Sequence, residues 1–164
     1  MINTGLFSSN DQAWETPQDL FNQLNDAFMA SIDVCATDKT AKCVNYYTPA
    51  IDGLKQNWVG TCWMNPPYGR EQIKWITKAR NSYIENNSTI ICLIPARPDT
   101  KVWQEIIFPN AIAVCFIKGR LKFGGCKDAA PFPSAIVVFG DKITAIQKET
   151  LDKLGKTYIK ASFN

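Results

Sequence analysis

The sequence predicts an α/β protein with a mostly parallel sheet, an antiparallel hairpin near the C-terminus and helices on both faces. Strand-like apolar runs alternate with helical segments along most of the chain, a pattern typical of parallel strands joined by crossover helices. Near the C-terminus two strand-like runs follow one another without a helix between them, which favours antiparallel pairing. No repeat, low-complexity tract or linker divides the 164 residues, so we expect a single domain over 1–164.

The first half of the chain is expected to supply two helices and four strands. The first helix has an apolar stripe, with Thr16 as its cap and Pro17 in its first turn. A second helix follows the third strand and repeats apolar residues near helical spacing. The helices are expected at 16–28 and 71–85, and the strands at 31–36, 43–47, 59–64 and 89–94.

The second half adds the antiparallel part of the sheet. We expect helices at 100–107 and 144–154 and strands at 112–117, 135–139 and 158–163, the last at a sheet edge. Gly155 is expected to close the last helix. Because ligands of such sheets bind beyond the carboxyl ends of the strands, the loops after Ala36, Met64 and Ile94 are expected to share one rim.

The composition excludes several classes of chemistry. Six cysteines form no C-x-x-C pair and histidine is absent, which argues against a zinc site and against a histidine base, so no metal is expected. With 46% apolar and 20% charged residues the chain is typical of a globular protein. Its apolar runs are too short to span a bilayer and its start lacks signal-peptide features, so we expect cytoplasmic residence and no membrane partner.

The strongest single signal is Asn65-Pro66-Pro67-Tyr68, which follows the strand-like run at 59–64. Proline cannot continue a central strand and holds the preceding residue in extended geometry. The motif therefore predicts a stiff strand end that offers two acceptors, the Asn65 amide oxygen and the Pro66 carbonyl, beside an aromatic ring. Two fixed acceptors beside a ring suit a flat heterocycle with an exocyclic amino group. The alternative is that the prolines only end the strand and Tyr68 packs on the surface.

Basic residues gather in two places, although the net charge is only +3. One group lies in a glycine-containing stretch and the other follows the proline motif; the members are Lys118, Arg120, Lys122 and Lys127, and Arg70, Lys74, Lys78 and Arg80. Such clusters can pair with the phosphates of a nucleic acid. The alternative is that these side chains only solvate the surface.

Several separated blocks carry a family resemblance; they include Trp14-Glu15-Thr16-Pro17, Ile32-Asp33-Val34-Cys35-Ala36-Thr37, Asp52-Gly53-Leu54, Trp63-Met64-Asn65-Pro66-Pro67-Tyr68-Gly69-Arg70, Leu93-Ile94-Pro95-Ala96-Arg97, Gly119-Arg120-Leu121-Lys122-Phe123 and Ala130-Pro131-Phe132-Pro133-Ser134. Over roughly residues 14–140 the chain resembles the S-adenosylmethionine-dependent DNA N6-adenine methyltransferases, in particular the short phage-type Dam-like group. Two departures concern cofactor contacts: Asp33-Val34-Cys35-Ala36 replaces the usual glycine-rich loop, and Thr40 stands where relatives often carry asparagine.

The resemblance implies a Rossmann-like methyltransferase sheet, S-adenosyl-L-methionine as cofactor, and methyl transfer to the exocyclic amine of a flipped adenine in duplex or locally unpaired DNA. Asn65, Pro66, Pro67 and Tyr68 would be catalytic. The cofactor would be bound by Thr16, Pro17, Asp33, Ala36, Asp52 and Asn65. The DNA would be bound by Arg70, Arg97, Arg120, Lys122 and Phe123. For Asp52 an ordinary turn is an equal interpretation, for Arg97 a pair with Asp99 is equally open, and for Phe123 core packing competes.

A sheet of this kind occupies most of the chain, so we expect no separate target-recognition domain. Recognition would come from insertions such as residues 119–134 or from a second subunit of a homodimer, and the recognition sequence would be short. The resemblance also implies a bacterial or phage-infected cell and protection of viral DNA from restriction. Two alternatives stay open: methylation of another planar amine (an RNA base, cytosine N4 or a protein glutamine), and a non-catalytic nucleic-acid-binding module of the same fold.

Overall fold

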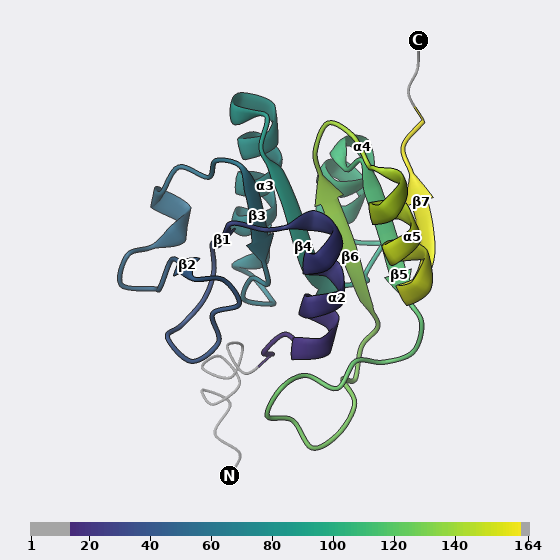
Figure 1. Cartoon of the computed structure of the whole chain (residues 1–164), viewed down its shortest axis with the longest axis horizontal. Helices are drawn as coiled ribbons and strands as arrows, with labels where there is room; N and C mark the ends of the chain where they lie inside the picture. Colours follow the sequence, from purple (N-terminus) through teal and green to yellow (C-terminus); the bar gives the residue numbers. More distant parts are fainter. Residues whose placement is uncertain (1–13, 162–164) are drawn as a thin grey trace.

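Seven strands form one open sheet in the computed structural model, which describes residues 14–161 (Figure 1). The strand order is β2-β1-β3-β4-β6-β5-β7. The first four strands along the chain are mutually parallel; they are β1 (Ile32–Asp33), β2 (Asn45–Tyr46), β3 (Thr61–Met64) and β4 (Thr89–Pro95). The predicted α/β class, parallel in its first part, is confirmed.

The C-terminal strands are antiparallel, as the sequence predicts. β6 (Ser134–Phe139) lies between β4 and β5 (Ala113–Ile117) and is antiparallel to both. β7 (Gly155–Ile159) pairs antiparallel with β5 and forms the edge of the sheet. The loop between β5 and β6, residues 118–133, extends beyond the ends of the strands, on the side of the molecule where α2 begins (Figure 1).

Helices cover both faces of the sheet because its central strands are apolar on both sides. Successive residues of β4 alternate: Ile91 and Leu93 belong to one core cluster, and Cys92 and Ile94 to the other. The first cluster includes residues of α2 (Gln18–Phe28) and α5 (Ala145–Leu154); the second includes residues of α3 (Gln72–Asn86) and η3 (Val102–Ile107), which the short α4 (Phe108–Asn110) follows. None of the helices within residues 14–161 is long and apolar enough to cross a membrane.

The start of the first helix and the end of the first strand differ from the sequence prediction. Pro17, not Thr16, is the N-cap of α2, and no side chain caps the helix. The Thr16 hydroxyl instead accepts a hydrogen bond from Asn65. β1 stops after Asp33 because the carboxylate of that residue takes the N–H of Cys35, which a neighbouring strand would otherwise bind.

Two elements in the second half also differ in detail. The helix expected at 100–107 is present, but η3 has π-helical hydrogen bonding, and the N–H of Phe108 donates to the carbonyl of Trp103. The edge strand begins at Gly155, directly after α5. Glycine is required at this position, because a Cβ would collide with the carbonyl of Phe116 on β5. Positions 162 and 163 of the predicted strand lie outside the described residues.

Candidate active site

A cavity of about 490 Å³ opens at the carboxyl ends of β1, β2 and β3, a size typical of small-molecule sites. It brings together most of the residues that the sequence analysis assigns to catalysis or to the cofactor: Thr16, Asp33, Ala36, Asp52, Asn65, Pro66 and Pro67. Pro17 and the loop after β4 are not part of the lining. The parallel strands β1, β3 and β4 end at the same edge of the sheet, as expected, but only the loops after β1, β2 and β3 line the cavity.

The amide of Asn65 is held at the cavity wall by residues 14–16, the segment that precedes α2 and that we call the strap. Its Nδ2 donates to the carbonyl of Trp14 at 2.6 Å and to the hydroxyl of Thr16 at 3.0 Å. These bonds use both amide hydrogens and assign which end of the side chain is nitrogen. The opposite atom, Oδ1, is buried and has no hydrogen-bond partner within the described part of the chain. A buried unpaired acceptor costs about 1–3 kcal/mol, so a hydrogen bond from a ligand donor that reaches this oxygen would recover that cost.

The ring of Tyr68 lies beside the cavity, in a group that we call the aromatic cluster: Trp14, Tyr68, Phe123 and Phe132. The Trp14 ring is nearly parallel to that of Tyr68, at 17° with centroids 6.4 Å apart, and Phe132 meets Tyr68 edge-on at 5.5 Å. The Tyr68 hydroxyl donates to the carbonyl of Leu93 over 3.4 Å. Burial raises the pKa of Tyr68 above its ordinary value, so the phenol stays neutral.

Asp33 is a buried carboxyl, 2% exposed, at the carboxyl end of β1. Its Oδ1 accepts from the N–H of Cys35 at 3.2 Å and its Oδ2 from the N–H of Lys42 at 3.1 Å. Burial raises the pKa of Asp33 to about 7, against the opposing effect of these hydrogen bonds and of the Lys42 charge. A cationic ligand would favour the ionised form, so Asp33 suits a positively charged group of a ligand.

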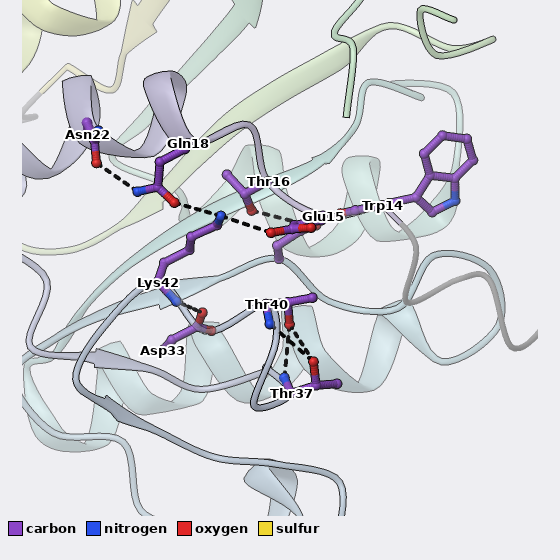
Figure 2. Close-up of polar contacts among 10 residues, drawn as sticks. Trp14, Glu15, Thr16, Gln18, Asn22, Asp33, Thr37, Thr40 and Lys42 are labelled. Atoms are coloured by element: carbon purple, nitrogen blue, oxygen red, sulfur yellow. Dashed lines mark hydrogen bonds and ion pairs between the residues drawn. The ribbon is translucent and has the colours of Figure 1, made fainter. Parts of the chain in front are cut away.

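A chain of polar side chains connects the cavity with α2 (Figure 2). Lys42, whose side chain is only 5% exposed, lies between the Gln18 Oε1 atom at 2.9 Å and the Glu15 Oε1 atom at 3.4 Å. Gln18 in turn donates to the Asn22 side chain at 2.8 Å. Glu15 and Lys42 have no role that the sequence predicts, because 27 positions separate them and no local spacing signals their contact. Their ion pair anchors the strap beside the cavity.

Two turns form other parts of the cavity wall. The hydroxyls of Thr37 and Thr40 lie 3.0 Å apart, and the N–H of Thr37 donates to Thr40 Oγ1 at 2.9 Å. Asp52 has a left-handed backbone with φ of 61°, and its Oδ1 accepts from the N–H two residues later. The turn that the sequence allowed at Asp52 is therefore present and faces the cavity. The turn packs closely on Val34, the residue that follows β1. Gly53 permits this approach, because a Cβ there would collide with the carbonyl of Val34.

The residues predicted to contact DNA separate into an exposed and a buried set. Arg70, Arg97, Arg120 and Lys122 are exposed, and the last two lie on the β5–β6 loop. The Arg97 guanidinium lies 5.9 Å from the ring centre of Phe132. Phe123 is different: it is 1% exposed and packs in the aromatic cluster, so its ring is in the core rather than on the surface.

Comparisons with known proteins agree with this architecture. Residues 3–153 match the model of the family described as DNA N-6-adenine-methyltransferase (Dam). A protein of Haemophilus phage HP1 (strain HP1c1), named DNA N-6-adenine-methyltransferase, is 28% identical over 151 residues, which cover 87% of this chain and 86% of the relative. The family match therefore includes the strap, the cavity and the proline corner, by which we mean Asn65-Pro66-Pro67-Tyr68. The chain belongs to the Dam family of DNA N6-adenine methyltransferases.

Proposed function

We propose that this chain transfers the methyl group of S-adenosyl-L-methionine to the N6 amine of an adenine flipped out of DNA, at a short recognition sequence. The observation that carries the proposal is the state of Asn65. Asn65 lines the cavity, and its Oδ1 atom is buried without a hydrogen-bond partner among the described residues, while its two amide hydrogens are already bound by the strap. An acceptor prepared in this way suits an incoming amino group.

The chemistry of the adenine amine explains why acceptors are needed. Its nitrogen lone pair is delocalised into the ring, so the amine is a poor nucleophile. When Asn65 Oδ1 and the Pro66 carbonyl accept its two N–H groups, they favour a more tetrahedral nitrogen and stabilise the charge that develops on it. Fixed dipoles act here without reorganisation, because the prolines hold the backbone. The nitrogen would form a bond to the methyl carbon as the S–CH3 bond breaks, its electron pair would stay on sulfur as a neutral thioether, and the methylated amine would then lose one proton. A strong base is not required for this, and the chain has no histidine.

The cavity fits the cofactor that the family uses. When bound, S-adenosyl-L-methionine supplies a methyl group on a sulfonium, and positioning is the main remaining task. Asp33 would receive the ammonium of its methionine part, because the buried carboxyl gains most from a cation beside it. Trp63 and Trp75 give the cavity flat apolar surfaces, and the buried Nε1 of Trp63 has no hydrogen-bond partner among the described residues. These groups match a ligand that is both aromatic and charged.

The direct test is incubation of the protein with tritiated cofactor and separate DNA, RNA and protein acceptors, followed by nucleoside and amino-acid analysis. We expect label in N6-methyldeoxyadenosine from DNA. Label in RNA, in cytosine or in glutamine would replace the proposed substrate. Calorimetry of cofactor binding completes the test, since a protein that binds DNA but not the cofactor would be a non-catalytic module. Sequencing of the methylated positions then defines the recognition sequence.

A further inference from the structure

We infer that Thr16 is a positioning residue, whose hydroxyl, together with the carbonyl of Trp14, locks the Asn65 amide in the orientation that presents Oδ1 to the substrate amine. The inference rests on the proposed function and deepens it. It also gives Thr16 a task other than the cofactor contact that the family resemblance implies. The two roles differ in what they predict for catalysis and for cofactor affinity.

A side-chain amide needs such a lock because its two orientations are similar in shape. Rotation by half a turn exchanges oxygen and nitrogen, and this terminal torsion has only a weak preference of its own. In the wrong orientation Asn65 would present an NH2 group to the NH2 of adenine, so two donors would face each other. The strap prevents this, because the Trp14 carbonyl can only accept and would repel Oδ1 at the observed 2.6 Å.

The lock is effective only if its two acceptors are themselves fixed, and three kinds of contact fix them. The backbone of Glu15 accepts from the N–H of Gly124 at 2.8 Å, which ties the strap to the β5–β6 loop. The side chain of Glu15 pairs with Lys42 on the opposite side. The ring of Trp14 packs on Phe123 and other members of the aromatic cluster. The strap is thus held by a backbone hydrogen bond to the β5–β6 loop, by an ion pair with Lys42 and by packing in the aromatic cluster.

Thr16 itself is placed for this role. It is 3% exposed, and its Oγ1 lies 3.0 Å from the Nδ2 of Asn65, although 49 positions separate the two residues. It does not cap α2, so the helix gives no reason for a hydroxyl at this position. The orientation of Asn65 is therefore set before any ligand binds. Because a hydroxyl can accept or donate, the Trp14 carbonyl selects the orientation and the Thr16 hydroxyl holds the amide in it. Loss of the hydroxyl would leave one amide hydrogen unpaired and the amide less firmly held.

The experiment compares Thr16→Val, which keeps the shape and removes the hydroxyl, with Thr16→Ser, which keeps the hydroxyl. Thr150→Val on α5 is the matched control, because Thr150 is also buried but does not line the cavity. Three quantities are measured: kcat for methyl transfer, cofactor Kd by calorimetry, and solvent exchange of the Asn65 side-chain amide by NMR. The amide signal is assigned by its loss in Asn65→Ala.

We expect Thr16→Val to lower kcat about tenfold, the scale of one buried hydrogen bond, with cofactor Kd within about twofold and faster amide exchange. Thr16→Ser recovers most of kcat and of the protection. An unchanged kcat and exchange rate in Thr16→Val would overturn the inference, and so would a rise in cofactor Kd without a change in exchange. If the valine variant does not fold, Thr16→Ala replaces it. If the wild-type protein does not methylate adenine, the proposed function fails, while amide exchange still decides whether Thr16 holds the Asn65 amide.

Discussion

The two sides of the proline corner are held by different kinds of contact. On the cavity side, hydrogen bonds hold Asn65 and Asp33 at the wall of the pocket, and Lys42 contributes its charge through Glu15. On the other side, Tyr68 is packed ring against ring in the aromatic cluster, with the indole of Trp14 stacked on it. The polar side is therefore prepared for a ligand, whereas a base that stacks on the same face of Tyr68 has to displace the indole.

This difference separates two costs of the proposed reaction. The cofactor would bind to groups already in place, so little ordering is needed on that side. On the aromatic side one ring contact would be exchanged for another, because an aromatic pair contributes about 0.5–1.5 kcal/mol and a base stacked on an aromatic ring about 1–3 kcal/mol. We therefore expect changes on the polar side to affect chemistry or cofactor affinity, and changes on the aromatic side to affect use of DNA.

The largest effect is expected from Asn65→Ala, which removes the prepared acceptor. By analogy with the loss of one oxyanion-hole donor, kcat should fall about 100- to 1,000-fold. Cofactor Kd should change little, because Asp33 and the remaining cavity wall stay in place. Tritium transfer to DNA and calorimetry measure the two quantities. Asn45→Ala, at an exposed asparagine on β2, is the control, and full activity in Asn65→Ala would disprove the role of the amide oxygen.

The second largest effect is expected from Tyr68→Ala, which tests the aromatic side. Loss of one base-stacking surface should lower kcat/KM for DNA by about 1–3 kcal/mol, or roughly 5- to 150-fold. Tyr68→Phe keeps the ring and loses only the long 3.4 Å bond to the Leu93 carbonyl, so its effect should be small. Steady-state kinetics with varied DNA distinguish the two variants. Equal losses in both would mean that the hydroxyl, and not the ring, matters.

The third prediction concerns the pH dependence of cofactor binding. Because burial raises the pKa of Asp33 to about 7, the carboxyl is mostly ionised at pH 8 and mostly neutral at pH 6. Affinity for a ligand ammonium should therefore fall about tenfold as the pH is lowered from 8 to 6. The neighbouring Cys43 thiol does not titrate in this range, because burial and the charge of Asp33 raise its pKa to about 11.

Calorimetry at pH 6, 7 and 8 measures this dependence, and two variants show which carboxyl causes it. Asp33→Asn should bind the cofactor weakly and lose the pH dependence, whereas Asp52→Asn should keep it. The same dependence in Asp33→Asn would assign the titration to another group.

The raised pKa of Asp33 also affects the pH dependence of folding stability. Because burial penalises the charged form, the contribution of Asp33 to folding is most favourable below pH 4 and decreases as the pH rises through 7.

The parts of the site that follow from the sequence are those that local chemistry fixes. The Asn65-to-Tyr68 corner is predictable because two prolines determine the backbone and end the strand by themselves. The contact of Thr16 with Asn65 is not, since it joins segments 49 positions apart and depends on how α2 packs on the sheet. The local sequence predicts that Thr16 caps the helix, but in the structure its hydroxyl binds Asn65 instead.

The same distinction explains the strands and the loop. β4 and β6 are apolar runs buried on both faces, so their extent follows closely from the sequence. β1 is shorter than its apolar run because the Asp33 side chain competes for backbone N–H groups. Phe123 lies between basic residues in a loop, and only the packing of the aromatic cluster shows that it is buried.

The smallest effects are expected from the exposed cations of the β5–β6 loop. Arg120→Ala and Lys122→Ala should each weaken DNA binding for all sequences and leave kcat nearly unchanged, because neither residue lines the cavity. If each neutralises one phosphate, each variant should reduce the slope of log affinity against log salt by about 0.9. Fluorescence anisotropy with a labelled duplex at several salt concentrations measures the slope.

Lys153→Ala, at an exposed lysine on α5, is the matched control. A slope that is unchanged in the loop variants but reduced in the control would place the DNA on the α5 face. A reduced slope in the loop variants alone would place it against the loop that also holds the strap through Gly124, so that the DNA and the catalytic amide would share one support.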